Sequence, residues 1–131
     1  MEERNFKILI AGENIQFRDT LAARLRVLGF SVDLVTGGFH LIHSVEVKQD
    51  FNLVIIHENM NDMPAEEMIS LIRLNKKKSE LPILFISNKN DEEEVYDLVI
   101  KGANEYMVKT PNFQHIVDRA NKYFNLLKNH S

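Results

Sequence analysis

A histidine stands at the end of an apolar run in the first half of the chain. Residues 52–60 read NLVIIHENM, so four aliphatic residues lead directly into His57. An imidazole can exchange a proton near neutral pH, accept a phosphoryl group or bind a transition metal. A run of this kind is typical of a buried strand, and a reactive side chain at its end is held at a defined place. His57 is therefore the first candidate for chemistry.

Polar residues also follow three other apolar runs of strand length. They are Gly12 and Glu13 after residues 6–11, Ser87 at the end of residues 81–87, and Lys109 at the end of residues 104–109. If the strands are parallel, their carboxyl ends meet at one edge of the sheet, where α/β proteins place their functional site. We therefore expect Glu13, His57 and Lys109 to converge near one point.

The apolar runs alternate with longer segments whose apolar residues recur with helical period. The expected strands cover residues 6–11, 30–35, 51–57, 81–87 and 104–109, and a helix follows each of them. This alternation predicts one parallel sheet with right-handed crossovers and helices on both faces. Residues 51–57 and 81–87 are apolar on both faces, as central strands must be, whereas residues 30–35 alternate like an edge strand. A single domain over residues 1–131 accommodates these elements.

Capping residues predict where the helices begin and end. The expected caps are Asn14, Asn90 or Asp91, and Asn112 at the N-termini, and Gly29 and Gly102 at the C-termini. Pro64 suits the first turn of the third helix, and Lys76–Lys78 suit its end, where cations interact well with the helix dipole. Val99 and Leu127 are expected on the buried sides of the fourth and fifth helices.

The composition excludes several classes of protein. The net charge of −3 gives no electrostatic basis for binding nucleic acid or an anionic membrane. The absence of cysteine excludes disulfides, thiol nucleophiles and zinc–thiolate sites. No apolar stretch reaches the roughly 20 residues that span a membrane, and the acidic N-terminus lacks the features of a signal peptide. We expect a soluble, cytoplasmic domain without nucleic-acid or membrane partners.

Together, the strand ends resemble those of the response-regulator receiver family, the flavodoxin-like domains of two-component signalling. The stretches that carry the resemblance are ILIAGEN, LVIIHENM, ILFISN and GANEYMVK. In that family the first strand ends in two acids and the third in the aspartate that accepts the phosphoryl group. The fourth ends in Thr or Ser, and the fifth carries an aromatic residue followed by Lys. The resemblance covers essentially the whole chain and implies a doubly wound, five-stranded parallel sheet of order 2-1-3-4-5.

The chain departs from the family pattern where the phosphoryl group would be transferred. His57 stands at the phosphoacceptor position, and Gly12 replaces one residue of the acidic pair, which leaves Glu13. Asn59 can still offer a carbonyl. An imidazole nitrogen, however, is poorly matched to Mg²⁺, which prefers oxygen ligands in octahedral geometry. We therefore expect weak or absent Mg²⁺ binding and no other cofactor.

Three functions are compatible with these residues. The favoured one is a pseudo-receiver that acts in signal transduction by phosphorylation-independent protein–protein interaction and is not an enzyme. The second is a phosphorelay receiver that is still phosphorylated, at His57, Glu58 or Asp62. The third is an unrelated flavodoxin-like binding protein or enzyme, but AGENIQFR offers few phosphate-binding groups and no nucleophile with a nearby base is visible.

The strand-end residues form a degenerate version of the family's phosphorylation pocket. They are Gly12, Glu13, His57, Asn59, Ser87 and Lys109. In a purely structural interpretation, Glu13 pairs with Lys109 and hydrogen-bonds His57, and Ser87 bonds to Asn88 or Lys109. In a second interpretation, His57 is a proton sensor whose pKa a neighbouring carboxylate raises toward physiological pH.

A partner-binding face is expected in the C-terminal half of the chain. Tyr96 and Ile100 form an i, i+4 pair off the buried stripe of the fourth helix, and Tyr106 occupies the position of the family's switch aromatic. An exposed apolar patch of these three residues would suit a protein partner, such as a kinase or another signalling protein. It would equally suit a second copy of the chain in a homodimer.

Overall fold

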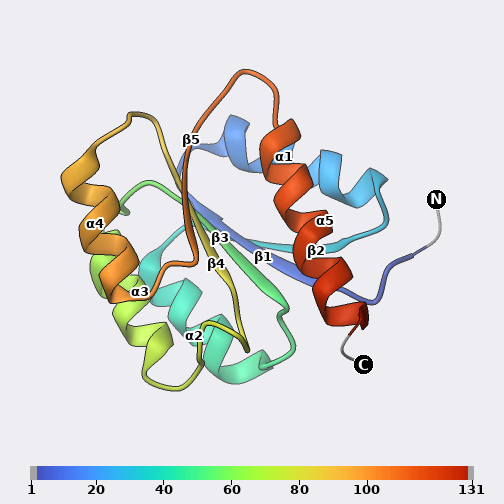
Figure 1. Cartoon of the computed structure of the whole chain (residues 1–131), viewed down its shortest axis with the longest axis horizontal. Helices are drawn as coiled ribbons and strands as arrows, with labels where there is room; N and C mark the ends of the chain where they lie inside the picture. Colours follow the sequence, from blue (N-terminus) through green and yellow to red (C-terminus); the bar gives the residue numbers. More distant parts are fainter. Residues whose placement is uncertain (1–2, 130–131) are drawn as a thin grey trace.

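Parallel strands and helices alternate through residues 3–129, the part of the chain that the computed structural model describes (Figure 1). The strands are β1 (Lys7–Gly12), β2 (Ser31–Val35), β3 (Leu53–His57), β4 (Ile83–Ser87) and β5 (Glu105–Val108). The helices are α1 (Ile15–Val27), α2 (Gly38–Lys48), α3 (Ala65–Arg73), α4 (Glu92–Lys101) and α5 (Gln114–Asn129). The five-stranded sheet has the order β2-β1-β3-β4-β5, and each neighbouring pair is parallel. The predicted doubly wound, flavodoxin-like fold is confirmed.

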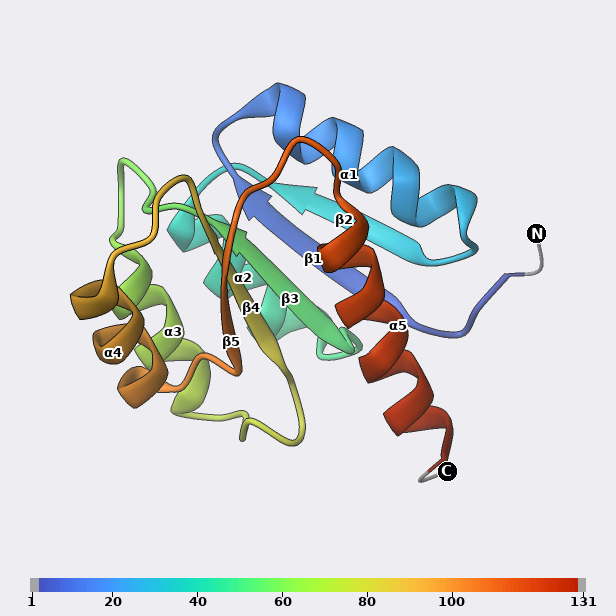
Figure 2. The same ribbon diagram turned by 45° about the horizontal axis from the view of Figure 1, so that its top comes forward.

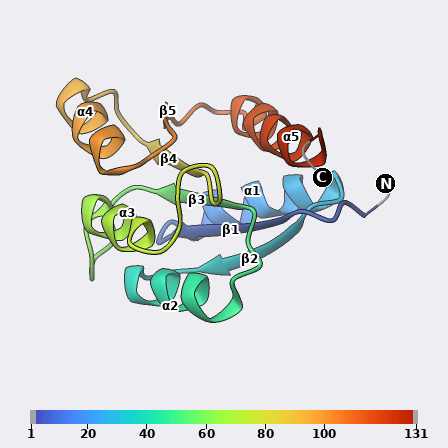
Figure 3. The same cartoon turned by 60° about the horizontal axis from the view of Figure 1, so that its bottom comes forward.

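The helices cover both faces of the sheet. α1 and α5 lie on one face, and α2, α3 and α4 lie on the other (Figure 3). Alternate residues of a strand serve the two cores, so Ile8 and Ile10 pack toward α1 and α5 while Leu9 packs toward α2 and α3. Because β3 and β4 are covered on both faces, every residue of these two strands is buried.

Capping residues bound the helices largely as the sequence predicts. Asn14 Oδ1 accepts a hydrogen bond of 3.0 Å from the Phe17 N–H at the start of α1. Asp91 accepts hydrogen bonds from two amides at the start of α4. Gly29 and Gly102 follow their helices with φ values of 97° and 124°, which favour glycine.

Several predicted boundaries are wrong by a few residues. β3 begins at Leu53 because the side chain of Asn52 takes the place of a backbone acceptor and binds the Lys7 N–H at 2.8 Å. β4 begins at Ile83, after Pro82, which has no N–H to donate to a strand pair. Pro64 precedes α3 as its cap instead of lying in its first turn. α3 ends at Arg73, so Lys76–Lys78 lie beyond it.

Two residues that were expected to be buried are exposed. Val99 on α4 and Leu127 on α5 have 41% and 45% of their surface exposed. α4 rests on the sheet through one fully buried residue, Leu98. The fully buried stripe of α5 ends at Ala120, and in its later turns the half-buried Tyr123 and Phe124 pack against the core. Within residues 3–129, no helix is long and apolar enough to cross a membrane.

Candidate functional site

His57 ends β3 and is buried at the carboxyl edge of the sheet. Only 3% of its surface is exposed, and its Nε2 lies 3.0 Å from Asn88 Oδ1. Because an amide oxygen can only accept, Nε2 carries the proton of the neutral ring and donates it to this bond. Burial lowers the pKa of His57 below its usual value, and the nearby charge of Lys109 lowers it further. The hydrogen bond to Asn88 and the negative charge of Glu58 raise the pKa, but they do not outweigh the burial. The rise of this pKa on which the proton-sensor interpretation depends is therefore wrong.

Phe17, from the first turns of α1, covers the imidazole. The centroids of the two rings are 4.0 Å apart and their planes differ by 23°, so the rings stack. Phe113 packs edge-on against Phe17 at 5.2 Å between centroids, and Lys109 Nζ lies 5.3 Å from the centroid of Phe17. Phe17 was not among the predicted site residues. The sequence indicates this role only through the presence of a large aromatic residue in the first turn of the helix that follows the first strand.

Glu13 contacts the loop after β3 and does not join His57 and Lys109. Both of its carboxylate oxygens lie 3.1 Å from the backbone N of Asn61, whose N–H they accept. The predicted cluster, in which Glu13 pairs with Lys109 and bonds His57, is wrong. The physical reason is that Glu13 lies beyond the last residue of β1, Gly12, where it is exposed and binds the loop after β3. The imidazole and the ammonium both contact the ring of Phe17 instead.

Glu58 adds a second connection between the ends of β3 and β4. Its backbone has a φ of 63°, a left-handed conformation that is uncommon for residues other than glycine. Its Oε1 accepts a hydrogen bond of 2.9 Å from the Asn88 N–H, while His57 donates to the side chain of the same asparagine. Two successive residues therefore hold Asn88 in place.

Asp62 caps a helix that has no capping side chain of its own. Gly37 precedes α2 and has no side chain to offer, and Asp62 accepts hydrogen bonds from the N–H groups of Gly38 (2.9 Å) and Phe39 (3.2 Å). These bonds from the backbone lower the pKa of Asp62. The sequence did not reveal this role, because the capping residue lies more than twenty positions away from the helix it caps.

The other predicted pocket residues have structural partners as well. Asn59 Oδ1 accepts a hydrogen bond of 2.7 Å from the Ala65 N–H and so caps α3. Ser87 is fully buried, and its Oγ accepts from the Lys89 N–H at 3.2 Å, so the expected side-chain bond to Asn88 or Lys109 is wrong. The reason is local geometry, because a serine oxygen readily binds the amide two residues ahead. Lys109 meets Ser87 through the backbone, since its N–H donates to the Ser87 carbonyl at 2.7 Å.

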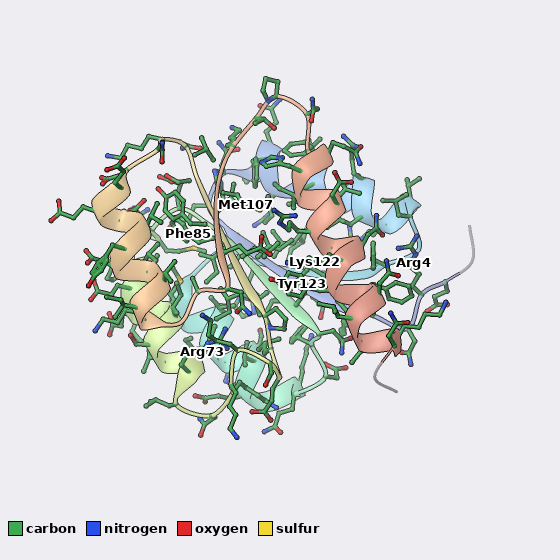
Figure 4. The ribbon with its side chains drawn as sticks, viewed as in Figure 1. Arg4, Arg73, Phe85, Met107, Lys122 and Tyr123 are labelled. Atoms are coloured by element: carbon green, nitrogen blue, oxygen red, sulfur yellow. The ribbon has the colours of Figure 1, made fainter. Side chains whose placement is uncertain are left out.

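Tyr106 on β5 turns inward and does not extend the exposed patch of α4. Its ring is half-buried, with its centroid 5.5 Å from that of Phe85, whose place at the centre of the sheet Figure 4 shows. Its hydroxyl donates to Glu94 Oε1 at 2.7 Å and also lies 3.0 Å from the Lys89 carbonyl oxygen. The predicted patch of three residues is therefore reduced to Tyr96 and Ile100, which are 61% and 62% exposed.

The residues at the carboxyl edge do not suit a magnesium ion. Within residues 3–129, no group of three or more His, Asp or Glu side chains is placed to hold a metal. The carboxylate of Glu13 already accepts a backbone N–H, and the side-chain oxygen of Asn59 accepts the first N–H of α3. His57 can offer only a nitrogen. Mg²⁺ requires several oxygen ligands in octahedral geometry. The donor set thus disagrees with the metal that an ordinary member of the resembling family would hold.

Comparison with known proteins points to one family. A family model described as the response regulator receiver domain matches residues 8–121. The chain is similar to the chemotaxis protein CheY-3 of Vibrio cholerae, with 27% identity over 125 residues that cover 95% of each protein. It is also similar to the chemotaxis protein CheY of Pseudomonas aeruginosa, with 25% identity over 122 residues that cover 90% of this chain and 95% of the relative.

Solved structures share the fold. The chemotaxis response regulator CheY4 of Vibrio cholerae superposes with a TM-score of 0.81 at 20% identity, covering 90% of this chain and 98% of that one. The response regulator TrrA of Thermotoga maritima, solved in complex with Mg²⁺–BeF, gives a TM-score of 0.79 at 24% identity, again covering 90% of this chain and 98% of that one.

Proposed function

This chain belongs to the response regulator receiver domain family, and on that basis we propose that it is a pseudo-receiver, which signals by protein–protein contact without phosphorylation of an aspartate. Receiver domains interact with kinases and other signalling proteins, and the partner is expected among these. The proposed domain has no enzymatic activity of its own and binds no cofactor.

The observation that carries the proposal is the state of His57 at the phosphoacceptor position. Its Nε2–H is donated to Asn88, and Phe17 stacks on one face of the ring. Only 3% of the surface of His57 is exposed, so the whole ring is almost closed to solvent. Phosphoryl transfer requires an in-line approach to a nucleophilic atom. Burial and the Asn88 bond therefore restrict the access of a phosphodonor to the imidazole.

The two neighbouring acids are also engaged, which favours the pseudo-receiver over the phosphorelay alternative. Glu58 accepts the Asn88 N–H, and Asp62 accepts the amides that begin α2. Phosphorylation of either carboxylate would disrupt a bond that positions the loop after β3 or the start of α2. Without a set of oxygen ligands for Mg²⁺, the charge that develops on a transferring phosphoryl group would also go uncompensated.

Intact-mass measurement after incubation with acetyl phosphate and Mg²⁺ tests the proposal. We expect an unchanged mass, whereas a receiver with an aspartate at the acceptor position gains one phosphoryl group under the same conditions. The spectra are recorded near neutral pH so that an acid-labile adduct on histidine is retained. A gain of one phosphoryl group that His57→Gln, Glu58→Gln or Asp62→Asn abolishes would overturn the proposal and identify the acceptor.

A further inference from the structure

A pocket opens at the amino edge of the sheet, opposite the edge at which His57 lies. Its volume of about 410 Å³ is in the range of small-molecule sites, roughly 300–1,000 Å³. Four of the residues that line it directly precede a strand, namely Phe6, Asn52, Pro82 and Asn104. Figures 1 and 2 show the loop after α3 and the last turns of α5 at this same end of the molecule.

The last turns of α5 supply an apolar wall to this pocket. Tyr123, Leu126 and Leu127 line it, and both leucines are 45% exposed. The hydroxyl of Tyr123 donates to Glu105 Oε2 on β5 at 2.6 Å, which fixes the ring on the side of α5 that faces β5 (Figure 4). A ligand with an apolar body would remove these leucine side chains from water, which is favourable.

Polar side chains with unused hydrogen-bond donors line the same pocket. Asn52 Oδ1 accepts the Lys7 N–H at 2.8 Å, which fixes the orientation of the amide and leaves Nδ2 as its donor. Lys78 and Ser79, in the loop after α3, also line the pocket. Among the residues that the structure describes, Asn52 Nδ2, the Lys78 ammonium and the Ser79 hydroxyl have no hydrogen-bond or ion-pair partner. These groups can therefore donate to a ligand.

The loop after α3 gives the pocket a positive rim. Residues 76–80 contain three lysines and one acid, Glu80, whose Oε1 accepts the Lys77 N–H at 3.0 Å. Within residues 3–129, none of these three lysines is ion-paired. A positive rim beside an apolar wall favours a ligand that carries a negative group on an apolar body.

We propose that this pocket binds a small amphipathic carboxylate, an acid with an aliphatic or aromatic body. The body would lie against the last turns of α5, and the two carboxylate oxygens would accept hydrogen bonds from Lys78 and from Asn52 Nδ2. Because the pocket lies at the edge opposite His57, the inference goes beyond the proposed function. The ligand would act as a regulator and not as a cofactor.

Titration of sodium octanoate and of 1-octanol into the ¹⁵N-labelled full chain tests this proposal. The two molecules have the same chain length, and only octanoate carries a charge. We expect octanoate to shift amide signals at the amino edge of the sheet and in the last turns of α5, and to leave those around His57 unchanged. Octanoate should bind at least about fivefold tighter than octanol, and added salt should reduce this difference.

Two variants test the recognition of the carboxylate. Lys78→Gln removes the charge, and Asn52→Asp replaces the donor with an oxygen that repels the ligand. Asn52→Asp keeps an acceptor for the Lys7 N–H, so the contact at the start of the sheet is preserved. Each variant should weaken octanoate by about fivefold and leave the binding of octanol unchanged.

A third variant tests the apolar wall, and two more are matched controls. Leu127→Gln should weaken octanoate and octanol alike, because both lose the same apolar contact. Leu74→Gln removes a leucine that is 74% exposed but does not line the pocket, and Lys77→Gln removes the lysine next to Lys78. Both controls should leave the binding of the two molecules unchanged.

Any of four titration results would overturn the proposal: no saturable binding of octanoate, shifts that map to the carboxyl edge, equal affinity for octanol, or an equal loss of affinity in the controls. Co-sedimentation of the chain with phosphatidylglycerol vesicles would assign the surface to a membrane, and self-association in sedimentation velocity would assign it to a second copy. Either result would also overturn the proposal. The pseudo-receiver proposal depends on the mass measurement and stands or falls independently.

Discussion

The imidazole Nε2 of His57 and the side-chain oxygen of Asn88 are 3.0 Å apart, and the bond between them joins the ends of β3 and β4. Glu58 strengthens the same junction, because its carboxylate accepts the backbone N–H of Asn88. In the proposed pseudo-receiver, this junction lies at the phosphoacceptor position, which His57 occupies. A fixed connection between two strand ends suits a domain that presents a constant surface to its partner.

Acid should destabilise the fold through His57. Burial lowers the pKa of this imidazole from its usual 6.5, so the folded chain stays unprotonated there at pH values at which the unfolded chain is already protonated. The unfolded state then binds more protons, and the free energy of unfolding falls as the pH drops below about 6.5. Urea denaturation followed by circular dichroism should show a shallower fall in His57→Gln than in the wild type. The same slope in both proteins would contradict this assignment.

Phe17→Leu should raise the pKa of His57 toward 6.5. Leucine keeps much of the apolar volume but removes the stacked ring, so water gains access to the imidazole and its charged form is penalised less. The substitution should also lower the free energy of unfolding by about 1–3 kcal/mol. An NMR titration of the His57 ring protons measures the pKa.

Phe30→Leu is the matched control for Phe17→Leu. Phe30 is as deeply buried and packs against Phe6 and Phe124, on the same face of the sheet but in a different aromatic cluster. It should cost similar stability and leave the titration of His57 unchanged. An equal pKa change in both variants would show that general loosening of the core, and not the stacked ring, controls the imidazole.

Much of the architecture follows from the sequence, because it depends on local patterns. The apolar runs of β3 and β4 predict central parallel strands, and Asn14, Asp91 and Gly102 mark helix ends through local hydrogen bonding and backbone freedom. The strand ends that carry the candidate site could be predicted for the same reason.

The contacts within the site could not be predicted, because they join residues that are distant in sequence. Sequence spacing placed Glu13, His57 and Lys109 at one edge, but it did not show that Phe17 would contact both His57 and Lys109. The side-chain oxygen of Asp62 caps a helix that begins 24 residues earlier. Side-chain direction after a strand end depends on loop geometry, which alternation along the strand does not specify.

Asp62→Ala should loosen the start of α2. The variant loses the carboxylate that accepts the N–H groups of Gly38 and Phe39, and Gly37 has no side chain to replace it. Hydrogen exchange at these two amides should therefore become faster than in the wild type, while exchange in α5 stays unchanged. Asp62→Asn keeps an oxygen acceptor and should retain most of the protection. Equal exchange in all three proteins would contradict the capping role.

Gly38→Ala should destabilise the chain more than Gly37→Ala. A Cβ at Gly38 would lie 2.6 Å from the Cβ of Met63, an atom next to the backbone that cannot move without shifting the loop. A Cβ at Gly37 would approach only the carboxylate oxygen of Asp62, at 3.1 Å, and that group can rotate. We expect a cost of about 1–3 kcal/mol for Gly38→Ala, measured by urea denaturation, and a smaller cost for Gly37→Ala. The reverse order would contradict the packing of the loop on α2.

Arg73→Met should lower the free energy of unfolding by about 2–4 kcal/mol, because one guanidinium makes four hydrogen bonds to the two connections that lead into β4 and β5. Arg73 donates to the carbonyls of Gly102, Lys76 and Leu81 and to Asn104 Oδ1, at 2.9 to 3.1 Å, where α3, the chain before β4 and the start of β5 meet (Figure 4). Burial lowers the pKa of Arg73 to about 10, which still leaves the group charged at neutral pH.

Two further variants separate the shape of the Arg73 guanidinium from its charge. Arg73→Lys keeps the charge but lacks the planar fork, so it should recover only part of the stability lost in Arg73→Met. Arg119→Met removes an arginine whose side chain is 45% exposed and ion-paired with Glu105, and it should cost at most about 1 kcal/mol. Urea denaturation followed by circular dichroism compares the three proteins. Equal costs for Arg73→Met and Arg119→Met would mean that the four hydrogen bonds of Arg73 contribute no more than a surface ion pair.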